Sequence, residues 1–308
     1  MRHIISLKGT RLTCLLIFAI SFLRKSIHSF SLHPPKVSPA RYKAISMDNI
    51  YELEEMEIKE LLYPSKNTLF QETNVILIPT HVPKTRFLDA ILPKPTNVME
   101  NFLRKDHGKI GVDVSVEFPL SKHDEGARKL VIKALEASHT SISNHDIDTF
   151  SALISKYFEK FEQLIETDNP CTKAKARIVS SRGSIGQKCP RWHVDHVPLR
   201  LVVSLLGPGC VYIPHENEMK YPESLDRSAL NDLDVENSNE ANKLICPKDG
   251  SKAALSAKVG DAVFLMGRAW ETLNSDVKAA PHMSPVLKEG QPRVLLTVDV
   301  VPNDCMKC

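Results

Sequence analysis

Hydrophobic residues in the first half of the chain recur at helical spacing. They predict a surface helix over 48–62, short helices over 85–92 and from Val98 to Leu103, and a longer helix over about 123–138. Another long helix is predicted to start near Asn144, a suitable N-cap. Its apolar positions form one broad stripe, which indicates a face packed on a core.

The pattern changes near residue 173. From there the chain has short runs rich in Val, Leu and Ile, bounded by Gly and Pro, a pattern typical of an all-β region. Similar runs at 74–79 and 111–118 predict two strands in the first half. A polar, mostly acidic segment over 215–250 interrupts the pattern and is predicted to be a loop or flap that would serve as a lid. We therefore expect an α+β protein in which N-terminal helices pack on a C-terminal double-stranded β-helix, or jelly roll.

The chain is thus predicted to consist of consecutive parts. They are a targeting presequence (1–46), an α-rich part (47–172), the double-stranded β-helix with its polar insert (173–304) and a tail (305–308). The tail holds a single C-x-x-C, and without a second pair two spare thiols are favoured over a zinc or redox site.

The leader has the features of a targeting segment. A basic start is followed by a 12-residue apolar run, Leu12 to Leu23, which is short for a bilayer span, and then by an acid-free stretch rich in Ser and Pro. This arrangement resembles the two-part presequence of proteins sent to complex plastids, where a Phe such as Phe30 often follows the cleavage point. A mitochondrial presequence and secretion are the alternatives, and no stable membrane span is expected in the mature chain.

The net charge of the chain is positive only because of the basic leader. Eight of the 40 Lys and Arg residues precede Asp48, the first acidic residue, and the chain has 37 acidic residues. The remainder therefore carries a net negative charge, so no nucleic-acid partner is expected.

The segment "CPRWHVDHVPLR", residues 189–200, holds the densest candidate chemistry. On a strand, His193 and Asp195 would share one face and could bind one metal together. A distant third ligand would complete the two-His-one-carboxylate set that holds non-haem Fe(II). By itself H-x-D is expected about 0.7 times by chance in such a chain, so its context has to support it.

The order of motifs supplies that context. "VGDAVFLMG" and then "HMSPVLKEGQPR" follow the H-x-D segment, and His282 lies 89 residues after His193. This order resembles the Fe(II)/2-oxoglutarate oxygenases. The resemblance implies that His193, Asp195 and His282 are iron ligands and that Arg293 binds the far carboxylate of 2-oxoglutarate, with the bidentate geometry that a guanidinium offers.

A closer resemblance covers roughly residues 70–302. "CPRWHVDHVPLRL", "GDAVFLMG" and "HMSP" with "PRVLLTVD" resemble the family known as domain of unknown function 1826. Members often have "HRSP", with an Arg at the position of Met283 in this chain, so any substrate contact made by that family Arg is not expected here. The family has no settled activity, and metal-homeostasis genes near some bacterial members imply a connection with metals.

Other polar residues of the segment have open roles. Arg191 could share the face of His193 and Asp195 and contact the substrate, whereas Arg200 would face the other way unless Pro198 resets the strand. His196 is expected to be a supporting or core residue. Cys189 could join a zinc site or could simply be a small buried residue.

Three functions are compatible with the sequence. The first is an Fe(II)/2-oxoglutarate oxygenase acting on a small molecule or a protein side chain, with Arg191 as a catalytic contact. The second is a non-catalytic or zinc-binding protein of metal homeostasis. The third is a structural β domain in which the polar cluster is only a hydrogen-bond network.

Overall fold

A computed structural model describes residues 73–94, 108–165, 173–183, 189–232, 237–247, 250–271 and 277–301. The predicted presequence, the predicted helices over 48–62 and from Val98 to Leu103, and the C-x-x-C tail lie outside these residues. No helix in the described ranges is both long enough and apolar enough to cross a bilayer.

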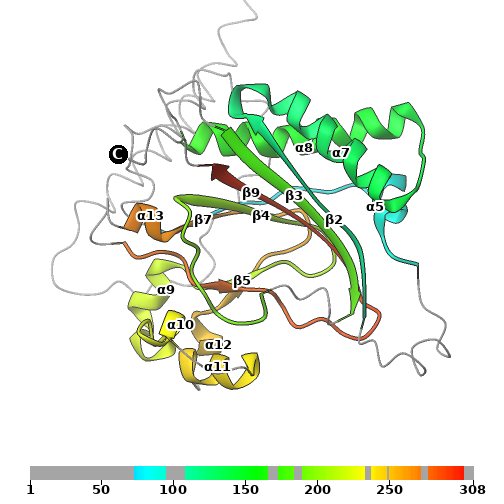
Figure 1. The fold of residues 1–308 in the computed structure, drawn as a ribbon. Coiled ribbons are helices and arrows are strands. Elements are labelled where there is room, and N and C mark those ends of the chain that lie inside the picture. The colour runs from blue at the N-terminus through cyan, green and yellow to red at the C-terminus, as the bar shows by residue number, and fades with distance from the viewer. Residues whose placement is uncertain are drawn as a thin grey trace, which may run out of the picture. The chain divides into compact units, whose positions relative to one another are not determined.

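A six-stranded antiparallel sheet is the largest element (Figure 1), with strands in the order β1-β7-β4-β9-β3-β2. The strands predicted at 74–79 and 111–118 are confirmed as β1 and β2, and both belong to this sheet. The first half of the chain thus contributes strands as well as helices. The strand bounds are β1 Val75–Ile78, β2 Gly108–Pro119, β3 Lys173–Gly183, β4 Leu199–Leu206, β7 Ala262–Met266 and β9 Pro292–Val301.

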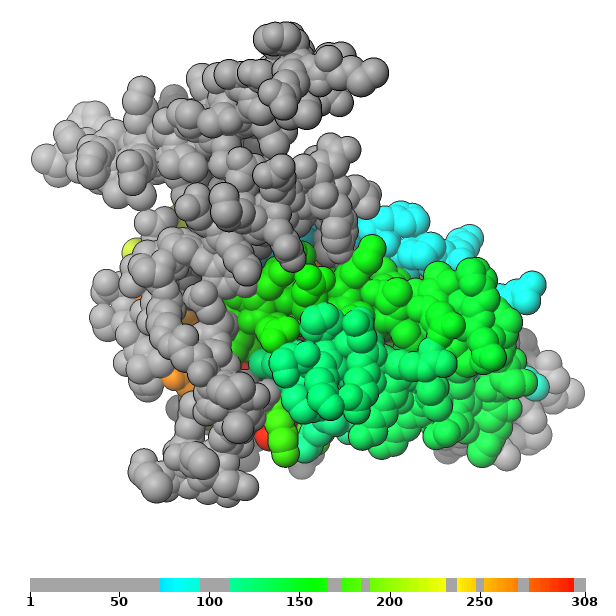
Figure 2. Space-filling view, turned by 90° about the horizontal axis from the view of Figure 1, so that it is seen from above, coloured from blue at the N-terminus to red at the C-terminus, as the bar shows by residue number. Residues whose placement is uncertain are grey.

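Helices cover one face of this sheet (Figures 1 and 2). They are α5 (Arg86–Ile91), α7 (His123–Ser138) and α8 (Asn144–Ile165), with the 3-10 turn η1 (Leu120–Lys122) before α7. Alternate residues of the strands point into this layer because side chains of a strand alternate between the two faces. On β3 they are Ala174, Ala176 and Ile178, and on β9 they are Val294, Leu296 and Val298, all fully buried.

The predicted long helices are confirmed, but the N-cap of α8 is not the expected residue. Ser143, rather than Asn144, caps the helix: its hydroxyl accepts a hydrogen bond from the Asp146 amide at 3.1 Å and donates to the Asp146 carboxylate. This reciprocal arrangement satisfies an amide that the helix leaves unpaired.

The opposite face of the large sheet lies against a three-stranded sheet in the order β6-β5-β8. Its strands are β5 (Val211–Tyr212), β6 (Leu255–Ser256) and β8 (His282–Met283). Val202, Val263 and Leu265 of the large sheet and Tyr212 of the small sheet belong to one buried apolar cluster. The described chain is thus a mixed α/β structure built on a large antiparallel sheet, as expected at this level.

The segment 215–250 is not the irregular loop that its polarity predicted. It contains α9 (His215–Lys220), η3 (Pro222–Ser224), α10 (Ala229–Asp232), α11 (Ser238–Ile245) and α12 (Gly250–Ala253), here called the helical insert. A few apolar residues spaced among many polar ones, such as Leu225, Leu230 and Ile245, form a small core with Trp192 and Val194. These contacts outweigh the low helical propensity of the short, polar segments.

Candidate metal centre

Two backbone hydrogen bonds join the halves of the candidate site. The amide of His193 donates to the carbonyl of His282 at 3.0 Å, and the amide of His282 donates to the carbonyl of His193 at 2.9 Å. The imidazole rings lie side by side, with centroids 4.3 Å apart. Residues 89 positions apart in sequence are therefore held in register by the main chain.

Residues 189–198, here called the ligand loop, do not form a regular strand. Only His193 makes an isolated bridge; the loop is otherwise fixed by single bonds to its neighbours. The Ser284 amide donates to the Cys189 carbonyl at 2.7 Å, the Arg268 amide to the Asp195 carbonyl at 2.8 Å, and the Gly267 amide to the Pro198 carbonyl at 2.9 Å. We expected His193 and Asp195 to be close because they would share one face of a strand. They are close for a different reason, because the irregular loop is held in place by these bonds.

His193, Asp195 and His282 nevertheless converge. One ligand atom from each lies within 4.8 Å of the others. Nε2 of His282 is 3.2 Å from Oδ2 of Asp195, and Nε2 of His193 is 3.8 Å from Oδ1. Two imidazole nitrogens and a carboxylate oxygen are the donors of the facial metal site of non-haem iron proteins.

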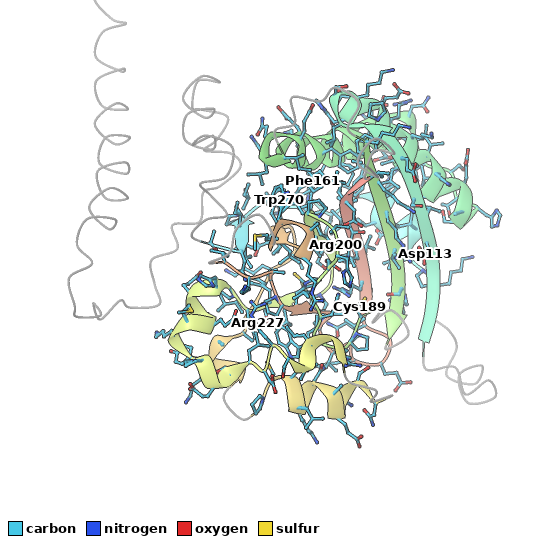
Figure 3. The ribbon with its side chains drawn as sticks, turned by 60° about the vertical axis from the view of Figure 1, so that its left-hand side comes forward. Asp113, Phe161, Cys189, Arg200, Arg227 and Trp270 are labelled. Atoms are coloured by element: carbon cyan, nitrogen blue, oxygen red, sulfur yellow. The ribbon has the colours of Figure 1, made fainter. Side chains whose placement is uncertain are left out.

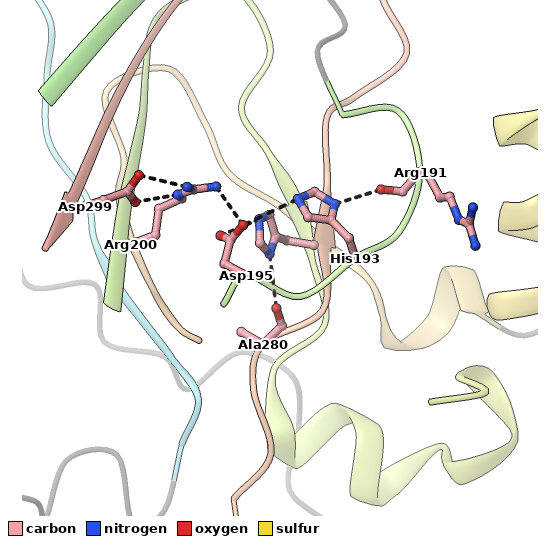
Figure 4. A network of polar contacts seen from close by, with 7 residues as sticks. Arg191, His193, Asp195, Arg200, Ala280 and Asp299 are labelled. Carbon is pink, nitrogen blue, oxygen red and sulfur yellow. Dashed lines mark hydrogen bonds and ion pairs between the residues drawn. The ribbon is translucent and has the colours of Figure 1, made fainter. Parts of the chain in front are cut away.

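Hydrogen bonds fix which ring nitrogens are available. Nδ1 of His193 donates to the Arg191 carbonyl at 2.9 Å, and Nδ1 of His282 donates to the Ala280 carbonyl at 3.1 Å (Figure 4). A carbonyl can only accept, so each Nδ1 carries the proton and each neutral ring presents the Nε2 lone pair to the cluster. Oδ2 of Asp195 is buried and accepts no hydrogen bond. Three lone-pair donors facing one another repel unless a cation lies between them, so the donor set fits a divalent metal.

Arg200 orients the carboxylate of this set. It donates from Nη1 to Oδ1 of Asp195 at 2.7 Å, and its Nε and Nη2 form a fork on Asp299 at 2.6 and 2.8 Å (Figure 4). Of the two orientations that the sequence left open for Arg200, the structure has the one in which Pro198 resets the strand, because the loop turns there before β4 begins. Oδ1 of Asp195 thus accepts a hydrogen bond from Arg200, and Oδ2 stays available to bind a metal.

The electrostatics keep Asp195 ionised. Burial alone would raise the pKa of its carboxyl, but the hydrogen bond and charge that His282 supplies when Nε2 is protonated, together with the charge of Arg200, outweigh burial and hold that pKa well below its usual range. A carboxylate that stays ionised remains a metal ligand at any physiological pH.

Arg293 is the largest fully buried side chain among the described residues, with 2% of its surface exposed. Its Nε donates to the Pro208 carbonyl and its Nη1 to the Ser284 hydroxyl, each at 3.2 Å. No carboxylate of the described ranges pairs with it, and burial lowers the pKa of its guanidinium. A buried cation without a carboxylate is costly unless an anion binds it.

A cavity of about 330 Å³ connects these groups. His193, His282 and Arg293 all line it, and Asp195 contacts both histidines. One wall is the cavity face of the large sheet, made by the residues that alternate with those buried under the helices. They are Lys175, Arg177, Val179, Arg200, Val202, Arg293, Leu295, Thr297 and Asp299.

Asn242 of α11 holds the ligand loop from the other side. Its Oδ1 accepts from the Trp192 amide at 2.8 Å, and its Nδ2 donates to the Pro190 carbonyl at 2.7 Å and contacts Sδ of Met283 at 3.6 Å. Trp192 and Val194 pack into the core of the helical insert, while His193 and Asp195 between them point to the cluster. The sequence offered no signal for Asn242, one polar residue within a polar segment.

Three other candidate residues of the ligand loop are not part of the converging His-Asp-His cluster. The side chain of Arg191 points away from the cluster and does not line the cavity, so the predicted shared face with His193 is not formed (Figure 4). His196 is exposed rather than supporting or buried. Cys189 is exposed and lines the cavity, and a hydrogen bond with His193 lowers the pKa of its thiol, but it is not one of the three converging ligands. Figure 3 shows Cys189 and Arg200 between the large sheet and the helical insert.

The described chain is therefore a mixed α/β protein with a His-Asp-His cluster of metal-binding type. It belongs to the family described as protein of unknown function (DUF1826), whose match spans residues 129–299, more than half of the chain. No curated protein matches it.

Solved structures similar to this chain include dioxygenases. Dioxygenase for auxin oxidation 1 of Arabidopsis thaliana, in a complex with 2-oxoglutarate, is 9% identical, with 84% of this chain and 92% of that chain covered and a TM-score of 0.41. The rice dioxygenase for auxin oxidation is 10% identical, with 81% and 79% covered and a TM-score of 0.41. A full-length protein of Neurospora crassa, solved in complex with alpha-KG, is 11% identical, with 84% of each chain covered and a TM-score of 0.36. Likenesses of this size establish no shared chemistry, so the function is inferred from the site itself.

Proposed function

We propose that this protein is a metal-dependent oxygenase of the Fe(II)/2-oxoglutarate type. One observation carries the proposal: the His193–Asp195–His282 cluster and the buried, carboxylate-free Arg293 line or adjoin the same cavity. A metal site alone would suit a storage or structural role. A metal site beside a cationic pocket suits a metal that works with a bound anion.

The residues present would hold the metal through Nε2 of both histidines and Oδ2 of Asp195. When bound, Fe(II) would supply the activation of O₂ that couples substrate oxidation to the decarboxylation of 2-oxoglutarate into succinate and CO₂. The protein's own part is positioning. The Arg191 and Ala280 carbonyls hold the imidazole protons at Nδ1, and Arg200 holds the carboxylate.

Arg293 would bind the far carboxylate of 2-oxoglutarate. Its partner Ser284 lies two residues after His282, a separation of roughly 7 Å in extended chain. A short dicarboxylate can therefore reach from the cluster to the guanidinium. The Ser284 hydroxyl and the Pro208 carbonyl fix the guanidinium before the anion arrives, which lowers the cost of binding it.

The proposal extends to the fold. We propose that the two sheets are a double-stranded β-helix formed mainly by residues 173–301, with β1 and β2 as added edge strands. The substrate, a small molecule or a protein side chain, would enter the same cavity. The predicted plastid targeting of the leader remains part of this proposal.

Two measurements test the function. Purified protein should bind about one equivalent of Fe(II) or its substitute Mn(II), and with Fe(II), O₂ and ascorbate it should release succinate from 2-oxoglutarate. His193→Ala should lose both properties. The matched control is His196→Ala, an exposed histidine of the same loop, which should keep both.

The outcomes separate the alternatives. Tight zinc binding without succinate release, in protein that contains the cluster, would support the metal-homeostasis function instead. If wild type binds no metal and His193→Ala behaves as wild type, the cluster is only a hydrogen-bond network.

A further inference from the structure

One row of the large sheet connects the metal-type cluster to the neighbouring strands through charged side chains. Arg200 of β4 lies opposite Asp299 of β9, and on its other side Asp299 lies opposite Lys175 of β3. Side chains directly opposite each other on paired antiparallel strands are about 5 Å apart at Cβ. The pairing of the strands, rather than the ligand loop, therefore brings Asp299 to Arg200.

Arg200 divides its hydrogen-bond donors unequally between two carboxylates (Figure 4). Its Nε and Nη2 bind the two oxygens of Asp299 at 2.6 and 2.8 Å, whereas Asp195 receives one bond, from Nη1 to Oδ1 at 2.7 Å. A guanidinium binds a carboxylate most favourably through two parallel hydrogen bonds. Asp299 therefore has the stronger arrangement, and Asp195 has the weaker one.

This division decides what happens to the second oxygen of Asp195. Oδ2 is buried, accepts no hydrogen bond from the described residues and lies 3.2 Å from Nε2 of His282. Because Nη1 of Arg200 already contacts Oδ1 of the same carboxylate, a rotation of the guanidinium would bring Nη2 toward Oδ2. An oxygen that accepts from a guanidinium lies beside a positive charge, which repels a second cation. A fork of Arg200 on Asp195 would thus compete with a metal.

We propose that Asp299 is a positioning residue of the metal centre, which keeps Arg200 from forking on Asp195 and so leaves Oδ2 free. With Asp299 in place, Arg200 only orients the carboxylate of Asp195; without it, the same guanidinium becomes a competitor of the metal. That Oδ2 then binds a metal rests on the proposed function. The division of the Arg200 donors between two carboxylates does not.

Mn(II) binding to full-length protein, measured by calorimetry, tests the proposal. Asp299→Asn keeps the shape of the side chain but leaves one oxygen to accept from Arg200, so the fork is lost. The variant should bind Mn(II) at least about tenfold more weakly than wild type, the range expected when the support of a metal ligand is removed.

Asp113→Asn is the matched control. Arg177 of β3 makes a fork on Asp113 of β2 through the same two nitrogens, with both N···O distances at 2.7 Å, and Asp195 takes no part in it. This variant loses a fork of the same kind on the same sheet, and its Mn(II) affinity should stay within about twofold of wild type because the pair is largely exposed.

The double variant Asp299→Asn/Arg200→Met distinguishes positioning from a structural role. Without the guanidinium nothing captures Oδ2, so the double variant should bind Mn(II) at least about threefold more tightly than Asp299→Asn alone. If Asp299 only stabilised the sheet, the second substitution would weaken binding further.

A crystal structure of metal-free Asp299→Asn supplies a readout that does not depend on a metal. Nη1 and Nη2 of Arg200 should each contact one oxygen of Asp195. A single remaining contact, an unchanged Mn(II) affinity of Asp299→Asn, an equal loss in Asp113→Asn, or a double variant that binds no better than Asp299→Asn would each overturn the proposal. If wild type binds no metal while Arg200 forks on Asp195 in the variant, the positioning by Asp299 stands and the proposed function fails.

Discussion

The two faces of the large sheet use neighbouring residues of the same strands for opposite purposes. On β9, Val294, Leu296 and Val298 are fully buried in the core cluster that the sheet shares with α7 and α8, whereas Arg293, Leu295, Thr297 and Asp299 line the cavity. The helix-covered face consists of close-packed apolar groups, and such packing supplies most of the stability of a domain. The cavity face also contributes apolar residues to the smaller cluster that it shares with the three-stranded sheet, but it gathers in addition charged groups whose burial costs stability. On β9 the residues of the main core and the residues of the candidate site therefore alternate along the strand.

The largest expected effect compares adjacent leucines of β9. Leu296→Ala opens a cavity under the helices and should lower the free energy of unfolding by about 3 kcal/mol. Leu295→Ala removes a half-buried side chain on the cavity face and should cost about 1 kcal/mol. Denaturant unfolding of the two variants measures the difference. Equal losses would show that the cavity face is packed like the core.

A second prediction concerns Gly267, where β7 meets the ligand loop. A Cβ there would lie 1.8 Å from the Val197 carbonyl oxygen and 3.0 Å from that of Asp195, so Gly267→Ala must displace the loop. We expect a loss of about 2 kcal/mol in stability and a weaker Mn(II) complex, measured by unfolding and by calorimetry.

Gly290→Ala is the control for this change. Nothing lies within 4 Å of the added Cβ, although the φ of 67° favours glycine. It should cost about 1 kcal/mol and leave metal affinity unchanged. Unchanged metal binding in Gly267→Ala would mean that the loop tolerates displacement.

Asn242 links the helical insert to the ligand loop, and its removal should act on the site more than on the fold. Asn242→Ala leaves the Trp192 amide and the Pro190 carbonyl without their partner, and we expect about tenfold weaker Mn(II) binding. Asn242→Asp keeps an acceptor for the Trp192 amide, so its Mn(II) affinity should lie between that of wild type and that of Asn242→Ala.

Asn239→Ala changes an exposed residue of the same helix and should match wild type in metal binding. A loss of stability in Asn242→Ala with unchanged metal affinity would limit Asn242 to a structural role.

The smallest expected change in stability is a gain, and it concerns Arg293. Arg293→Met replaces a buried, carboxylate-free cation with an apolar side chain, and should raise the free energy of unfolding by about 1 kcal/mol while weakening 2-oxoglutarate binding at least tenfold. Arg182→Met, at a half-buried arginine bonded to the Pro93 carbonyl, should lower stability slightly and leave binding intact. Denaturant unfolding measures the change in stability, and calorimetry measures the change in 2-oxoglutarate affinity. A large loss of stability in Arg293→Met would show that the charge is structurally compensated.

Much of the secondary structure could be predicted from the sequence because apolar periodicity reports directly on burial. The helices over 123–138 and from 144 onward and the strands at 74–79 and 111–118 follow this rule. The helical insert does not, since its core is shared with Trp192 and Val194 from elsewhere in the chain. A pattern confined to the segment itself could not show that.

The candidate ligands were found for a partly wrong reason. His193, Asp195 and His282 converge through a turn and a backbone bridge, where a regular strand was expected. For Arg200 the sequence left two faces open, and the structure has the one in which Pro198 resets the strand, because a turn there changes the alternation of every later residue. Asn242 acts through hydrogen bonds to backbone atoms of the ligand loop. Such bonds impose no pattern on the sequence, so its role could not be predicted from residue spacing.

The reciprocal backbone bond between His193 and His282 has a consequence for the evolution of the family. Main-chain amides and carbonyls are the same whatever side chain they carry, so the spacing of these two positions does not depend on the histidines themselves. A relative that replaced either histidine would keep the geometry and change only the donor atoms. With such a frame, a change of donor atoms would alter or abolish metal binding without requiring a new fold.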